Sequence, residues 1–157
     1  MESVLKQNKF EEGKKFLVVN YYLDVDGTII TKEHQEALEL NDFLKYLFNT
    51  GEIYWLTTHC RYEDTSSVLS YIKPFLDSKN YDLIKNIFPT TWNTLKTEAI
   101  NFSQPFYWFD DYLLEVEKRI LLENRCLENW IKIDLGENDN NIMRAAMSNY
   151  PNLFSSL

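Results

Sequence analysis

Short apolar runs alternate with helix-like stretches along most of this chain, and the alternation predicts its elements. Five runs are rich in β-branched and aromatic residues and short enough to be buried strands. They cover residues 16–23, 53–56, 84–88, 106–109 and 130–133. Between and after them, apolar residues recur at helical spacing over residues 36–49, 65–76, 94–101, 113–129 and 142–147. Pro74 is expected to interrupt the second of these helices.

Strands that alternate with helices are typical of βαβ units and a mostly parallel sheet. We therefore expect an α/β fold with a doubly wound, Rossmann-like, five-stranded sheet and helices on both faces. The chain shows no internal repeat, low-complexity tract or linker, so residues 1–157 are expected to form a single domain.

Composition and charge narrow the class of protein. Hydrophobic residues make up 45% and aromatic residues 15% of the 157 residues, which is typical of a folded globular chain. The net charge of −8 disfavours binding to nucleic acid through basic patches. It does not exclude binding of a nucleic-acid end through a metal ion. Two cysteines form no disulfide framework, no run approaches about 18 apolar residues, and residues 1–15 are too charged for a signal peptide. These features predict a soluble, cytoplasmic protein without a membrane partner.

The first apolar run ends in two carboxylates, Asp24 and Asp26, followed by Gly27. Alternate residues of an extended strand point the same way, so one tight site can receive both carboxylates. Bringing two carboxylates together out of water costs several kcal/mol unless a positive group balances them, and a divalent cation would do so. The alternative is an acidic turn, because Asp-Gly is a common turn pair at strand ends.

Two further runs end in residues suited to phosphate chemistry. Thr57 follows the second run, and Asp110 and Asp111 follow the fourth. In an open α/β sheet the ligand crevice lies outside the carboxyl ends of the strands, so these groups should converge there with the first two aspartates. Taken singly, Thr57 is an ordinary strand-end hydroxyl, and the paired acids are suited to capping the next helix.

The acidic cluster needs a positive partner, and Lys96 at the start of a predicted helix is the best candidate. Lys85 is a weaker competitor for the same role, and a single lysine on a helix is most often only solvated. The order of these residues along the chain carries more weight than any one of them.

In this order the motifs resemble those of the haloacid dehalogenase-like superfamily of phosphohydrolases. The first motif is matched in full by Asp-Val-Asp-Gly-Thr at residues 24–28, the second by Thr57 and the third by Lys96. The fourth motif, an apolar strand that ends in paired acids, is matched by residues 106–111, and the resemblance spans roughly residues 16–135. The first motif is specific and the fourth fairly so, whereas the second and third persuade by their order.

The resemblance implies a phosphatase. Asp24 would be the nucleophile and form an aspartyl-phosphate, and Asp26 would be the general acid and then the general base. An aspartate at position 26 favours phosphate transfer over the dehalogenases of the superfamily, which lack it. Thr57 would bind the transferring phosphoryl oxygens, and Lys96 would steady Asp24 and the charge that develops on the phosphate.

The resemblance also implies Mg²⁺, which prefers oxygen ligands in octahedral geometry. Its ligands would be Asp24, the main-chain carbonyl of Asp26, and Asp110, with Asp111 near the ion or bridging through water. Substrate contacts are expected from four residues that lie in the first motif or just after the second: Gly27, Thr28, Thr58 and Arg61. Arg61 can hold a phosphate or carboxylate as a bidentate fork, or it can be a solvated loop residue.

Substrate selection in this superfamily usually comes from an inserted cap, and neither interval that could hold one is long enough here. We expect a capless, open site for a phosphorylated substrate, which can be macromolecular. A partner protein can also close such a site. A phosphoprotein or a nucleic-acid end would fit, and the acidic composition weighs against the second. His59 and His34 are interpreted as a polar loop residue and a surface residue.

Two alternatives keep the fold. The chain can be a catalytically silent module that binds a phosphorylated ligand or a partner protein. It can also be a phosphoacceptor that resembles a response regulator, although the Asp-Val-Asp-Gly-Thr run disfavours this. The full set of motif residues favours turnover over silent binding.

Overall fold

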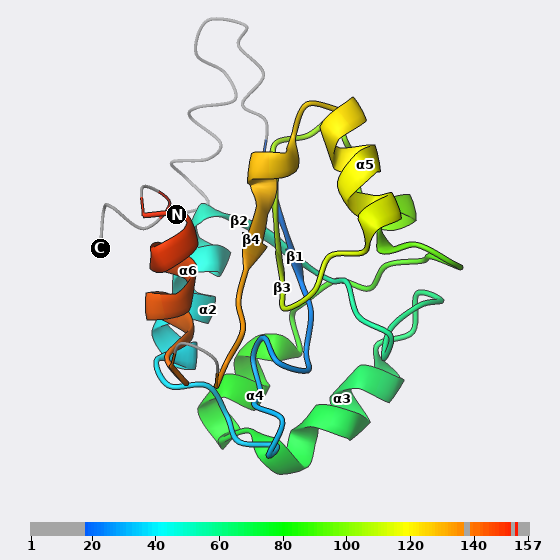
Figure 1. Ribbon diagram of the computed structural model, residues 1–157. Helices are drawn as coiled ribbons and strands as arrows, with labels where there is room; N and C mark the ends of the chain where they lie inside the picture. The colour runs from blue at the N-terminus through cyan, green and yellow to red at the C-terminus, as the bar shows by residue number, and fades with distance from the viewer. Residues whose placement is uncertain (1–17, 137–138, 152, 154–157) are drawn as a thin grey trace, which may run out of the picture.

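The computed structural model describes residues 18–136, 139–151 and 153. Its centre is a four-stranded, all-parallel sheet with the strand order β2-β1-β3-β4 (Figure 1). The strands are β1 (Val19–Leu23), β2 (Gly51–Trp55), β3 (Phe106–Asp110) and β4 (Trp130–Lys132). The predicted α/β class and parallel sheet are confirmed.

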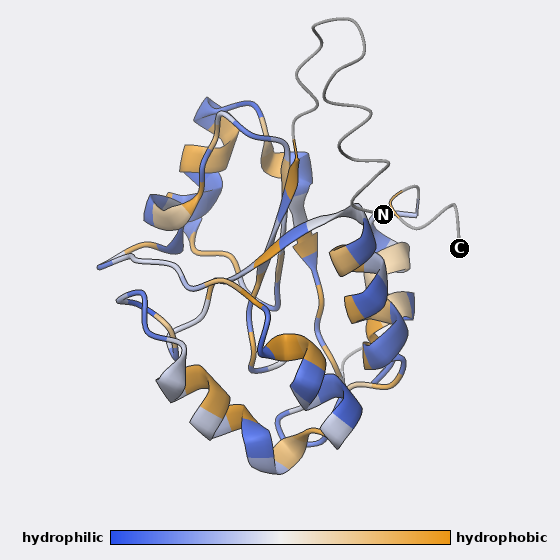
Figure 2. Ribbon diagram, turned by 180° about the vertical axis from the view of Figure 1, so that it is seen from behind, coloured by the Kyte–Doolittle hydropathy of each residue, from blue (hydrophilic) through white to orange (hydrophobic). Residues whose placement is uncertain are grey.

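Five α-helices occur in the described part of the chain, and each carries both hydrophobic and hydrophilic residues (Figure 2). They are α2 (Leu40–Thr50), α3 (Ser66–Ile72), α4 (Ser78–Ile84), α5 (Glu115–Glu123) and α6 (Ile142–Asn149). Three short 3₁₀ helices accompany them: η1 (Lys73–Phe75), η2 (Lys96–Ala99) and η3 (Leu127–Asn129). None of the helices in these residues has the length and apolar character needed to cross a lipid bilayer.

Helices cover both faces of the sheet, because successive strand residues point to opposite sides. On one face Leu23 of β1 belongs to a core cluster with Phe43 of α2 and with residues of α3, α4 and α6. On the other face Tyr22 and Trp108 pack in a second cluster with Leu121 of α5. Figure 1 shows the same division, with α2 and α6 on one side of the strands and α5 on the other.

The predicted fifth strand, residues 84–88, is not formed. Ile84 ends α4, and Phe88 makes only an isolated parallel bridge to Tyr54 beside β2. Helix α4, which the pattern did not predict, begins where the Asp77 carboxylate accepts a hydrogen bond from the backbone N–H of Asn80 at 2.8 Å. This capped helix takes the start of the apolar run, so too few residues remain for a strand.

Other element boundaries shift where the backbone adopts a left-handed conformation. Glu39 has a φ of 63°, and the helix predicted over 36–49 begins after it, at Leu40. Arg125, with a φ of 57°, separates α5 from η3 within the stretch predicted as one helix. Helix 94–101 is reduced to η2, whereas the interruption at Pro74 is confirmed by the change from α3 to η1. The predictions for residues 1–17 lie outside the described residues.

The strand order makes the boundary between β1 and β3 the place where the connections of the sheet diverge. From β1 the chain crosses through α2 to β2 on one side, and it later returns to β3 on the other side of β1. Strands β1 and β3 are therefore neighbours from which the connections diverge. In open α/β sheets such a reversal leaves a crevice at the carboxyl ends of the two strands, where ligands bind.

Candidate active site

The carboxyl ends of β1 and β3 bring Asp24 and Asp110 together. Asp24 continues the face of Tyr22 and Asp110 that of Trp108, so both point to the side of the sheet that carries η2 and α5. The backbone N–H of Asp24 donates to the carbonyl of Phe109 at 3.1 Å, which fixes the two ends to each other. Both carboxylates are buried, with 7% of Asp24 and 1% of Asp110 exposed.

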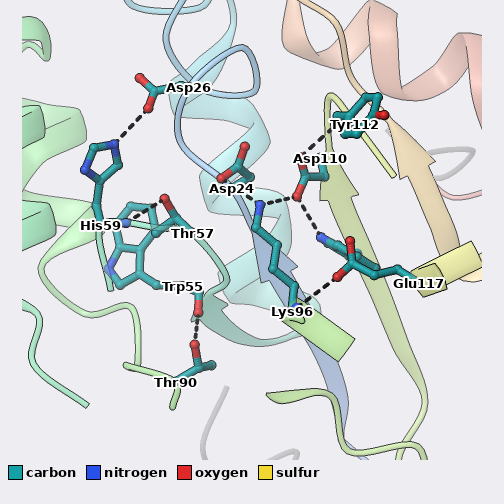
Figure 3. A network of polar contacts seen from close by, with 11 residues as sticks. Asp24, Asp26, Trp55, Thr57, His59, Thr90, Lys96, Asp110, Tyr112 and Glu117 are labelled. Atoms are coloured by element: carbon teal, nitrogen blue, oxygen red, sulfur yellow. Dashed lines mark hydrogen bonds and ion pairs between the residues drawn. The ribbon is translucent and has the colours of Figure 1, made fainter. Parts of the chain in front are cut away.

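Lys96 bridges these two carboxylates. Its Nζ lies 3.2 Å from Oδ1 of Asp24 and 2.6 Å from Oδ2 of Asp110 (Figure 3). The turn that carries Lys96 is held by α5, because the backbone N–H of Lys96 donates to Oε2 of the buried Glu117 at 2.9 Å. Lys85, the competing candidate, instead forms an exposed pair with Asp82 at 3.0 Å at the end of α4.

Asp111 completes a trio of acids that fits a metal ion. Asp24, Asp110 and Asp111 each offer a carboxylate oxygen, and these oxygens lie within 4.8 Å of one another. Three carboxylates against one ammonium group leave two negative charges unbalanced, which matches a divalent cation. Hard cations such as Mg²⁺ and Ca²⁺ take such oxygen ligands, so the donor set fits without selecting one of them.

Burial makes the charged forms of these acids costly. It raises the pKa of Asp24, which Lys96 partly offsets, and with the neighbouring Asp24 it raises the pKa of Asp110 to about 7. Burial and then the adjacent Asp110 raise the pKa of Asp111 to about 6. Burial lowers the pKa of Lys96, but the Asp24 and Asp110 carboxylates outweigh it and hold that pKa above its ordinary value. A bound cation would favour the ionised carboxylates instead.

Gly27 and Thr28, which follow the first two aspartates, are both buried. Gly27 has a φ of 77°, which favours glycine, and a Cβ at this position would lie 2.5 Å from Oδ2 of Asp111 and displace that carboxylate. Its N–H donates to the carbonyl of Ile30 at 2.8 Å. Thr28 is fully buried, and its hydroxyl has no hydrogen-bond partner among the described residues. The structure thus places Gly27 against the Asp111 carboxylate, and neither of these two predicted substrate residues lines the cleft that holds the acids.

Asp26 lies apart from the acidic trio and turns toward His59 (Figure 3). Its Oδ2 is 2.8 Å from Nε2 of His59, and its Oδ1 accepts a hydrogen bond of 2.6 Å from the Tyr71 hydroxyl. Burial and the Asp26 carboxylate raise the pKa of Tyr71 to about 12, so this hydroxyl remains a donor. Sequence reasoning interpreted His59 as a loop residue and missed Tyr71, because nothing in the pattern shows which way a residue of α3 faces.

Thr57, the residue of the second motif, is buried, whereas the adjacent Thr58 lines the site. Thr57 is 1% exposed, and its hydroxyl accepts a hydrogen bond from the backbone N–H of His59 at 3.3 Å. Thr58 lines an open cleft of about 490 Å³ together with Asp24, Lys96 and the other acids of the site. A larger groove, of about 840 Å³ between α2 and α6, contains none of the acids of the trio.

Arg61 also lines the 490 Å³ cleft, where it packs on an aromatic ring. Its guanidinium carbon lies 4.4 Å from the centroid of the Trp92 ring, and its buried Nε has no hydrogen-bond partner among the described residues. Trp92 was not predicted as a site residue, because its neighbours in sequence carry no motif. A guanidinium held over an aromatic ring can still bind an anion through its N–H groups.

Comparisons with known proteins identify no relative. The chain matches no protein-family model, and neither the curated proteins nor the solved structures give a match. Function is therefore argued from the geometry of the site and from the resemblance of its motifs.

Proposed function

We propose that this chain is a Mg²⁺-dependent phosphomonoesterase with a doubly wound, Rossmann-like fold of the haloacid dehalogenase-like type. The observation that carries the proposal is the position of Lys96 between Asp24 and Asp110, with Asp111 close enough to complete a divalent-cation site. This group occupies the carboxyl ends of two neighbouring strands at the point where the connections diverge. The residues between β2 and η2 pack into the main core through Val68, Ile72 and Ile84, which is consistent with a capless enzyme.

The proposed reaction has two steps on the chain's own residues. In the first, a carboxylate oxygen of Asp24 bonds to phosphorus, the bond to the leaving oxygen breaks, and Asp26 donates a proton to that oxygen. In the second, Asp26 takes a proton from water, whose oxygen attacks phosphorus and releases phosphate and the Asp24 carboxylate. Lys96 stabilises charge on the phosphoryl oxygens throughout. Bound Mg²⁺, held by Asp24, Asp110 and Asp111, would neutralise the acids and the phosphate.

Asp26 also supports a second candidate function, a module that binds a phosphorylated ligand without turnover. Both oxygens of its carboxylate are already engaged, by His59 and Tyr71. If these two contacts keep the Asp26 carboxylate away from the substrate, the site would bind phosphate but have no proton donor. Turnover separates the two candidates directly.

Metal removal is the first test of the phosphatase function. We expect p-nitrophenyl phosphate to be hydrolysed with Mg²⁺ and hydrolysis to stop in EDTA, because the unbalanced carboxylates repel the anionic substrate when no cation is bound. Added Mg²⁺ should restore the full rate, which would be followed by release of p-nitrophenolate. Phosphate binding measured by calorimetry without any turnover, on small esters and on phosphopeptides, would instead establish the silent module.

Arg61 is proposed to bind the anionic part of the substrate. Replacing Arg61 with methionine should weaken competitive inhibition by inorganic phosphate about tenfold, the loss expected for one charge-assisted hydrogen bond. The inhibition constant would be measured against p-nitrophenyl phosphate. Arg119→Met is the matched control, because Arg119 is exposed on α5 and does not line the cleft. Equal inhibition constants in wild type and Arg61→Met would remove Arg61 from the binding site.

A further inference from the structure

A cluster of aromatic and imidazole rings lies beside Asp26, on the side away from the acidic trio. The rings of His59 and Tyr71 stack, with centroids 3.8 Å apart and planes 15° apart. Behind them His34 stacks on Phe75 at 4.6 Å, and Nε2 of His34 lies 3.5 Å from the Tyr71 hydroxyl. These rings come from the loop after β1, the loop after β2, helix α3 and η1, so the cluster joins segments that are distant in sequence.

The cluster fixes a side chain that would otherwise be mobile. The Asp26 side chain is 51% exposed and stands on a loop, a setting in which an aspartate samples several rotamers. Here each carboxylate oxygen has its own partner, with Nε2 of His59 at 2.8 Å and the Tyr71 hydroxyl at 2.6 Å. The two partner rings also stack on each other, which restrains both of them.

A general acid works only when it is held within hydrogen-bond reach of the leaving atom. Asp26 lines the same cleft as Asp24 and Lys96, so it stands at the border between that cleft and the ring cluster. Two hydrogen bonds from the outer side restrict where its carboxylate can point. They also leave each oxygen with a second lone pair, which can carry the proton that Asp26 donates to a leaving group or can accept one from a water molecule.

We propose that His59 and Tyr71 are positioning residues that hold Asp26 for proton transfer to and from the substrate. The inference rests on the proposed phosphatase function and adds to it the residues that determine how well poor leaving groups are expelled. Removing either partner should slow the reaction of esters whose leaving oxygen needs a proton. For esters with an acidic leaving group, which departs without one, this first step should be affected little.

The experiment compares phenyl phosphate with 2,4-dinitrophenyl phosphate in the Mg²⁺-loaded protein. Tyr71→Phe and His59→Ala should each lower kcat/KM for phenyl phosphate, which reports the step that expels the leaving group, about tenfold, a part of the roughly 10²–10⁴-fold that general acid catalysis supplies. The loss in kcat/KM for the dinitrophenyl ester should stay under about twofold, because its leaving oxygen departs without a proton. His59→Gln, whose amide nitrogen replaces Nε2, should recover most of the rate. Tyr81→Phe, on α4 and outside the cleft, is the matched control.

A double-mutant cycle with Asp26→Asn separates positioning from structural damage. In that background Tyr71→Phe should cost nothing more, because the group that it positions is gone. Equal losses on both esters, or losses that add to that of Asp26→Asn, would overturn the inference while leaving the phosphatase in place. Wild-type leaving-group dependence in Asp26→Asn itself would overturn both this inference and the proposed role of Asp26. Thermal unfolding and Mg²⁺ titration of each variant verify that it is folded and loaded.

Discussion

Replacing Asp24 with asparagine is expected to lower Mg²⁺-dependent phosphate release by about 10⁴-fold or more, the scale of loss when a covalent nucleophile is removed. Asparagine keeps the shape of the side chain but lacks the anionic oxygen that would bond to phosphorus. Its amide also removes one of the three carboxylates proposed to hold the cation. The measurement is single-turnover phosphate release, combined with trapping of the acyl-phosphate on wild type by hydroxylamine.

Stability serves as the control for this variant. Asp24 is a buried carboxylate whose pKa is raised by burial, and its charge is a cause of the raised pKa of Asp110. Removing that charge relieves repulsion, so Asp24→Asn should unfold at a temperature no lower than wild type in EDTA. A folded Asp24→Asn that retains a tenth of the wild-type rate would place the nucleophile elsewhere. A wild type that accumulates a long-lived phosphoenzyme would favour the phosphoacceptor alternative.

The acidic part of the site was predictable from sequence because it depends on local rules. An apolar run that forms a parallel strand delivers the residue after it to the carboxyl edge of the sheet, so Asp24 and Asp110 had to lie at one edge. The strand order that makes them neighbours depends on pairing between distant segments and came only with the structure. Lys96 was identified from its place in the motif order, and its contacts with both carboxylates came only with the structure.

The parts that sequence did not predict depend on packing across the molecule. Tyr71 reaches Asp26 because α3 packs beyond the end of β1, and Trp92 supports Arg61 because its loop folds back on the cleft. Neither position has a residue type that marks a site. The fifth strand failed for a similar reason, since the competition between α4 and a strand was decided by the Asp77 cap.

Lys96→Met should be the most destabilising substitution in the site, by about 3–5 kcal/mol at pH 8 without metal, the usual cost of removing one partner of a buried ion pair. The Lys96 side chain is 15% exposed, and those of Asp24 and Asp110 are 10% and 2% exposed. Without the ammonium group, the buried carboxylates of Asp24 and Asp110 lose the positive charge with which both are paired. Urea unfolding at pH 8 in EDTA measures the loss.

The loss should shrink at pH 5.5, and the raised pKa values give the direction. Asp110 has a folded pKa of about 7 and an unfolded value of 3.8, so between these limits the folded state binds more protons than the unfolded state. Stability therefore falls as the pH rises through this window, and at pH 5.5, below the folded pKa of about 7, the protonated Asp110 needs no ammonium partner. Removing Lys96 raises these pKa values further, which enlarges the fall toward pH 8.

Lys85→Met is the matched control for the stability experiment. Lys85 pairs with Asp82 at 3.0 Å, but their side chains are 49% and 69% exposed, so its loss should cost under about 1 kcal/mol with little dependence on pH. Mg²⁺ should stabilise Lys96→Met at pH 8 more than at pH 5.5, because protons and the cation compete for the same oxygens. A loss that is equal at both pH values, or equal to that of Lys85→Met, would show that Lys96 does not balance the acidic trio. The roles proposed for Lys96 in catalysis and in folding have one physical origin, a single positive charge among three buried or half-buried acids.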